Sequence, residues 1–173
     1  MRHRLKKFCI AICTTALASG CTVFAPVAMN PGEPEQTVLA KLGTPTGRYA
    51  DGPDHLLEYA RAPFGQQTYM ARIGADGKLV SYEQVLTAQK FARIKAGQSG
   101  KDDVLRIIGG PRETEFLSLS QLEVWSYAYK ESGVWDSLMH VHFDRAGVVQ
   151  KMMNGPDPLF DPDMRFPLGR LRR

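Results

Sequence analysis

The feature that most constrains the fold of this chain is an internal repeat covering most of its length. Residues 38–45 (VLAKLGTP) recur 66 positions later as residues 104–111 (VLRIIGGP). The correspondence continues downstream, and the offset grows to 70 positions, as expected when insertions fall in turns. The repeat predicts two copies of one supersecondary unit, over residues 31–86 and 87–153.

Each unit is predicted to begin with a helix, over residues 35–42 and 101–108, because apolar residues recur there with i, i+1, i+4 spacing. Leu42 and Ile108 are expected to be equivalent core positions. A glycine followed two residues later by a proline ends each helix. Extended segments rich in aromatic and β-branched residues follow: 56–61, 68–73, 78–83, 122–130, 138–143 and 148–153. The expected α+β fold is therefore two tandem units, each a three-stranded antiparallel meander with helices packed on one face.

Residues 84–96 lie between these segments and contain apolar side chains but no proline or glycine. They predict a further helix, shared between the units and paired with the 101–108 helix. In the second unit, Trp125, Tyr127 and Tyr129 alternate along a strand. Alternate residues share one face, so these aromatic side chains are expected to lie beneath the helices.

The N-terminus predicts a lipid anchor. Basic residues precede an apolar run over residues 8–17, which is shorter than the roughly 20 residues of a membrane-spanning helix. Small residues leading to Cys21 resemble the bacterial lipobox, in which the chain is cut before the cysteine and the cysteine is acylated. We therefore expect a signal peptide over residues 1–20, acylation of Cys21 and a tether over 21–30. An ordinary secretory signal with a chance cysteine is the alternative.

Removal of the signal changes the composition of the chain. The whole sequence has a pI of about 9.0, but four of its 22 basic residues belong to residues 1–20, which leaves 18 basic against 18 acidic residues. A chain without net positive charge is not expected to bind nucleic acid. Cys9 and Cys13 leave with the signal, so no disulfide is predicted. Residues 154–173 are rich in Pro and Arg and are predicted to be a mobile tail.

Four segments resemble the BamE/SmpA/OmlA family of outer-membrane lipoproteins: 91–97 (FARIKAG), 109–111 (GGP), 125–127 (WSY) and 143–147 (FDRAG). The resemblance is good over the second unit and weak over the first. It implies an ααβββ fold, shared with proteins that resemble the β-lactamase inhibitory protein, and an accessory role in β-barrel assembly. The family's assembly-machine subunit has a single copy of the unit, whereas this chain has two. Thr22, in place of Asp after the cysteine, favours the outer membrane by analogy.

The function expected from the sequence is that of a non-catalytic lipoprotein at the periplasmic face of the outer membrane of a Gram-negative bacterium. Acylated Cys21 would anchor the protein in the membrane, and the folded part would bind an envelope protein. Its role would be accessory or scaffolding in envelope integrity, for example in outer-membrane protein assembly. Val134 and Trp135 lie in a predicted turn and are the candidate partner contacts, because exposed aromatic residues often anchor interfaces. A Trp135 folded back on its own sheet is the alternative. The runner-up function is a periplasmic inhibitor or ligand-binding module that uses the sheet face.

No enzyme, cofactor or metal site is predicted. His140 and His142 share one face of a strand and could form half of a metal site. No third ligand accompanies them at a suggestive spacing, which favours a polar strand face directed to solvent. Several serines could act as nucleophiles, but no nucleophile elbow frames them, and no catalytic residue is assigned.

Overall fold

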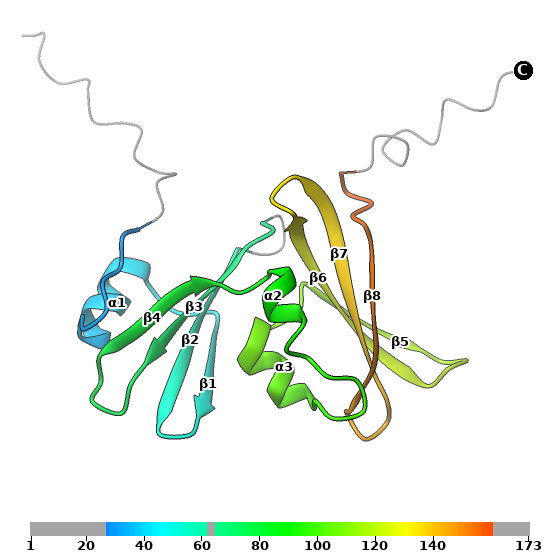
Figure 1. The fold of residues 1–173 in the computed structure, drawn as a ribbon, viewed down its shortest axis with the longest axis horizontal. Helices are drawn as coiled ribbons and strands as arrows, with labels where there is room; N and C mark the ends of the chain where they lie inside the picture. Colours follow the sequence, from blue (N-terminus) through cyan, green and yellow to red (C-terminus); the bar gives the residue numbers. More distant parts are fainter. Residues whose placement is uncertain (1–26, 62–64, 161–173) are drawn as a thin grey trace, which may run out of the picture.

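The computed structural model describes residues 27–61 and 65–160 (Figure 1). Cys21, the predicted signal peptide and residues 161–173 of the predicted tail lie outside the described residues. Of the described residues, 46% lie in strands or bridges and 15% in helices. The chain is therefore mostly β.

The structure contains two antiparallel sheets of four strands each. In both sheets the strands are hydrogen-bonded in the order in which they occur along the chain, β1-β2-β3-β4 and β5-β6-β7-β8. The elements in chain order are α1 (Glu35–Leu42), β1 (Gly47–Asp51), β2 (Asp54–Ala60), β3 (Thr68–Ile73), β4 (Leu79–Gln84), α2 (Ala88–Phe91), α3 (Lys101–Ile108), β5 (Glu113–Leu117), β6 (Leu122–Glu131), β7 (Trp135–Phe143) and β8 (Val149–Pro156).

The predicted fold class, two tandem α+β units with helices on one face of a three-stranded meander, is wrong. Each sheet gains a first strand, β1 or β5, that the sequence does not predict. In β5 four of five residues are exposed, so the strand lacks the alternation of buried and exposed side chains that identifies a half-buried strand. Both edge strands are held by backbone pairing to their neighbours, β2 and β6.

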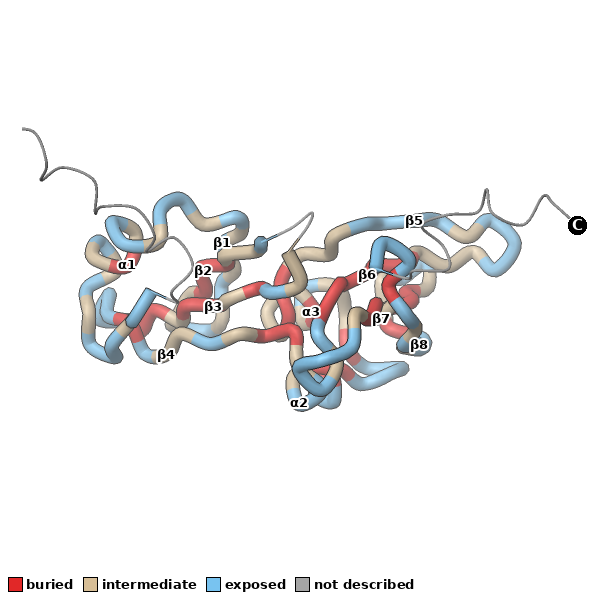
Figure 2. The backbone as a smooth tube through the Cα atoms, turned by 90° about the horizontal axis from the view of Figure 1, so that it is seen from above, coloured by how far each residue is buried: buried red, intermediate tan, exposed pale blue. Residues whose placement is uncertain are grey.

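The layers also differ from the prediction. Figure 1 shows α1 on the outer side of the first sheet and α2 and α3 between the two sheets. In the view from above, buried segments lie at the centre of both halves of an elongated molecule (Figure 2). Since α3 also approaches β1, it lies next to both sheets rather than covering one face of one sheet.

The helices α1 and α3 occupy the predicted ranges, and both end at a glycine with left-handed φ, 80° at Gly43 and 82° at Gly109. Glycine adopts this conformation without steric cost. Ile108 is fully buried, whereas Leu42 only packs at the edge of its core. The prediction that Leu42 and Ile108 are equivalent core positions is therefore wrong, because the two residues differ in burial.

Two main cores hold the sheets against the helices. In the first, Val38 of α1 packs on residues of β2, β3 and β4: Leu57, Ala71, Ile73 and Leu79. In the second, α2 and α3 cover Trp125, Tyr127 and Tyr129, which confirms that these three aromatic residues share the face beneath the helices. Phe91 meets Tyr129 edge-on at a centroid distance of 4.9 Å, an arrangement that adds about 0.5–1.5 kcal/mol to the burial itself.

Residues 84–96 do not form the predicted helix. Gln84 ends β4, Val85 and Leu86 are buried outside any helix or strand, and helix α2 is only four residues long. The hydroxyl of Thr87 accepts a hydrogen bond from the backbone N–H of Lys90 and caps α2. Val85 and Leu86 belong to different apolar clusters, so neighbouring side chains of this segment do not share the single buried face of an amphipathic helix.

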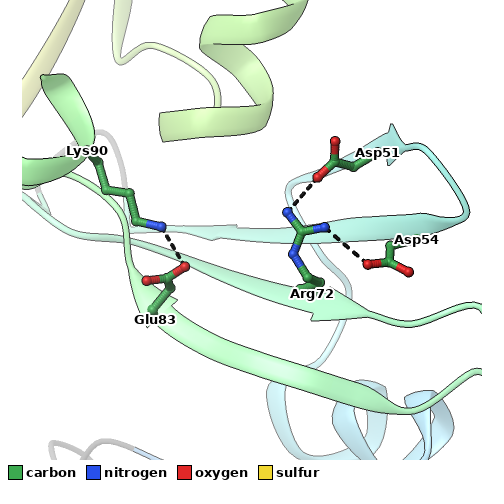
Figure 3. Close-up of polar contacts among 5 residues, drawn as sticks. All are labelled: Asp51, Asp54, Arg72, Glu83 and Lys90. Atoms are coloured by element: carbon green, nitrogen blue, oxygen red, sulfur yellow. Dashed lines mark hydrogen bonds and ion pairs between the residues drawn. The ribbon is translucent and has the colours of Figure 1, made fainter. Parts of the chain in front are cut away.

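The face of the first sheet opposite α1 carries ion pairs (Figure 3). The guanidinium of Arg72 on β3 contacts both Asp51 and Asp54 at the β1–β2 turn. Lys90 reaches from α2 to Glu83 of β4 at 2.6 Å. The second pair attaches α2 to the first sheet.

Strand β8 runs to Pro156 and so includes the first three residues of the predicted tail. The next residue, Asp157, is buried and forms an ion pair with Arg112 at 2.8 Å. Its backbone N–H also donates to the carbonyl of Asp136 at 2.9 Å. Residues 154–157 are therefore an ordered part of the second sheet and its surroundings, because a buried charge pair holds them.

Candidate functional site

The predicted partner contacts, Val134 and Trp135, lie at the tip of the β6–β7 hairpin. Val134 is 65% exposed and Trp135 is 69% exposed. Trp135 begins β7 directly opposite Glu131, and Ser132 and Gly133 adopt left-handed φ angles in the turn between them. Trp135 is therefore directed to solvent and is not folded back on its own sheet.

A hydrogen-bond network supports the hairpin below this tip. The carboxylate of Glu131 accepts hydrogen bonds from the Ser137 hydroxyl at 2.8 Å and the Asn154 amide at 2.9 Å. The Tyr129 hydroxyl donates to the side-chain oxygen of Asn154 at 3.0 Å. The bonds from Asn154 and Ser137 hold the pKa of Glu131 below its usual value. Because these contacts fix the hairpin before any partner binds, less conformational entropy is lost on binding.

The two histidines of β7 differ in burial and in their contacts. His140 and His142 lie on the face opposite Val141, but His142 is buried, so the predicted solvent-facing strand is wrong at this residue. Burial, with the charge of Lys151, lowers the pKa of His142. His140 contacts the Ser126 hydroxyl at 2.8 Å. No group of three His, Cys, Asp or Glu residues gathers within the described residues.

A cavity of about 290 Å³ lies where the two halves of the molecule meet. We call it the inter-sheet cavity. The first half lines it with Thr46, Tyr49, Glu58, Ala60, Gly65 and Thr68. The second half and the segment before it contribute Leu86, Gly110, Pro111, Arg112, Tyr127 and Ala128. Its size is near the lower limit for small-molecule sites in proteins.

Glu58 is the buried acid of this cavity, with only 3% of the residue exposed. Its Oε2 atom accepts hydrogen bonds from the Tyr49 hydroxyl and from the backbone N–H of Gly110, the latter at 3.0 Å. Burial and the neighbouring Glu58 carboxylate raise the pKa of Tyr49. Gly110 follows the end of α3, so Glu58 connects the first sheet to the second half of the chain.

Two glycines make room for this carboxylate. Gly47 lies opposite Glu58 in the β1–β2 pairing, and a Cβ atom there would lie 2.8 Å from Glu58 Oε2. Gly109 has a left-handed φ, and a Cβ atom there would lie 3.0 Å from Glu58 Cδ. Larger residues at either position would displace the carboxylate.

Sequence analysis does not identify Glu58 as a site residue. The available signal is its position two residues after Leu56, which places both side chains on one face of β2. An acid on the same strand face as a core leucine indicates a specific partner. That partner, Gly110, is 52 residues away along the chain, and nothing in the local pattern indicates it.

No family model, curated protein or solved structure matches this chain. The resemblance to the BamE/SmpA/OmlA family therefore stays a prediction. None of the helices in the described part of the chain is long and apolar enough to cross a bilayer.

Proposed function

We propose that this protein is a non-catalytic lipoprotein of the outer membrane that acts as an accessory or scaffolding subunit. In this proposal, acylated Cys21 holds the chain on the membrane, and the β6–β7 hairpin tip binds an envelope protein. The resemblance over residues 91–153 suggests outer-membrane β-barrel assembly as the process served.

The observation that carries the proposal is the exposure of Val134 and Trp135 at a braced hairpin tip. Exposed apolar residues scattered singly are common on proteins. Here two adjacent large apolar residues lie at the end of the two longest strands of the structure. Tryptophan is the residue type most enriched among interface residues with large binding energies, which supports a protein partner.

The test is capture of the partner in intact cells. A photocrosslinking amino acid at position 134, which leaves Trp135 in place, should capture a specific envelope protein. Trp135→Ala should weaken binding of that protein about thirtyfold, equivalent to about 2 kcal/mol, without lowering the melting temperature. Leu119→Ala is the matched control, because Leu119 is fully exposed in the β5–β6 turn at the other end of β6. Unchanged capture by the Trp135 variant would exclude this interface.

The anchor is tested separately. Cys21→Ser should leave an uncleaved precursor and abolish labelling by a radioactive fatty acid, because the thiol is the acylated group. A normally cleaved, soluble product would indicate an ordinary secretory signal.

A further inference from the structure

Glu58 is a buried carboxylate without a cationic partner. No ion pair joins it to Lys, Arg or His within the described residues. Arg112 also lines the inter-sheet cavity, but its guanidinium is paired with Asp157. Burial of a carboxylate is costly unless hydrogen bonds and opposite charge compensate it.

The two oxygens of this carboxylate are unequally satisfied. Tyr49 and Gly110 both donate to Oε2. Among the described residues, Oε1 has only the Thr46 hydroxyl as a donor, at 3.2 Å, and that hydroxyl lies equally far from the Glu58 backbone carbonyl. Because a hydroxyl has a single proton, Thr46 cannot donate fully to both acceptors. Oε1 therefore keeps acceptor capacity.

The end of α3 adds to the negative potential at the carboxylate. Glu58 contacts Gly110, two residues after the last residue of this helix. A helix C-terminus carries a partial negative charge, which favours a nearby cation and disfavours an anion. The buried acid and the helix end therefore favour the same kind of ligand.

We propose that the inter-sheet cavity binds an organic cation, with its ammonium or guanidinium group on Glu58 Oε1. The apolar part of the ligand would lie against Leu86, Pro111 and Ala128, which line the same cavity. This proposal goes beyond the scaffolding function and uses none of the residues of the hairpin tip.

The test uses n-butylammonium and its neutral analogue 1-butanol, which are similar in size and differ in charge. Binding is followed in the mature full-length protein by NMR, through the amide signal of Gly110, which is bonded to Glu58. Butylammonium should shift this signal saturably, with a Kd of about 1–10 mM, and butanol at least tenfold more weakly. Absence of a saturable shift, or equal shifts with both compounds, would overturn the proposal.

Two variants test the assigned residues. Glu58→Gln keeps the side-chain shape and should weaken butylammonium binding at least tenfold. Glu83→Gln is its matched control, because Glu83 lies on the same sheet as Glu58 but already pairs with Lys90. The Glu83→Gln variant should bind butylammonium normally. If Glu58→Gln does not fold, Ala60→Leu narrows the cavity with Glu58 intact and should abolish binding. Wild-type affinity in a folded Glu58→Gln or Ala60→Leu variant would contradict the assignment.

A second arm distinguishes two sources of the cation. The blocked peptide acetyl-Gly-Lys-Gly-amide carries the same ammonium group on a backbone. If the peptide binds at least as tightly as butylammonium, the natural ligand is a basic side chain of a protein. If the peptide does not bind, the natural ligand is a free amine. Both results support the cation site, provided that butylammonium binds.

Discussion

At the scale of single residues, the packing around a strand decides burial even against side-chain polarity. Glu58 and His142 both occupy buried positions on sheet faces. Glu58 receives two hydrogen bonds at Oε2, whereas the Nδ1 atom of His142 is buried and has no hydrogen-bond partner among the described residues. A buried nitrogen without a partner costs stability, and protonation of the ring would add a buried charge.

The stability of the protein should consequently depend on the protonation of His142. Its pKa in the folded state is lowered from 6.5, first by burial and then by Lys151 and His140. The unfolded chain therefore binds the proton more readily. The neutral His142 ring therefore contributes to the free energy of unfolding above pH 6.5. This contribution is lost as the pH falls toward and through the lower folded-state pKa.

We expect the melting temperature of the wild type to decrease when the pH is lowered from about 7.5 to about 5.5. His142→Gln should make this decrease smaller. The measurement is thermal unfolding by circular dichroism at both pH values. If the two proteins lose the same number of degrees, His142 does not carry the dependence.

At the scale of elements, the helices α1 and α3 have the same length and both end at a glycine, but they differ in what surrounds them. α3 lies between the sheets and buries both Val104 and Ile108 completely, whereas α1 buries only Val38. The difference follows from the layers, because α1 has a sheet on one side only (Figure 1).

Ile108→Ala should destabilise the protein by about 2–5 kcal/mol, since it leaves a cavity in a packed core. Leu42→Ala should cost only about 1 kcal/mol, because Leu42 is partly exposed. Urea denaturation of both variants gives the two free energies. Equal losses would show that α1 is packed as tightly as α3.

At the scale of the whole molecule, the halves are joined by packing and by polar contacts. Val85 of the connecting segment packs with Leu56 and Met70 of the first sheet. Glu58 receives the Gly110 N–H from the second half. These contacts couple the unfolding of one half to that of the other.

We expect a single cooperative thermal transition for the mature chain. Val38→Ala in the first core and Val104→Ala in the second should both lower that same transition, whereas Leu119→Ala on the surface should leave it in place. Differential scanning calorimetry measures the number of transitions. Two transitions, each sensitive to only one of the core variants, would show that the halves unfold independently.

The sequence by itself determined the elements whose signal is local. The helices 35–42 and 101–108 follow from apolar spacing and a terminal glycine, and the shared face of Trp125, Tyr127 and Tyr129 follows from alternation. The anchor at Cys21 is likewise a prediction from local motif, outside the described residues.

Only the tertiary structure decided the features that depend on distant partners. Edge strands β1 and β5 form because a neighbouring strand offers hydrogen bonds, although their own side chains are largely exposed or half-buried. Residues 84–96 form only the four-residue helix α2, because Val85 and Leu86 enter different clusters before it begins. The inter-sheet cavity requires Glu58 to meet Gly110 across 52 residues. The periodicity of apolar residues indicates the environment of a single helix or strand. These features arise instead from the packing of two elements that are distant along the chain.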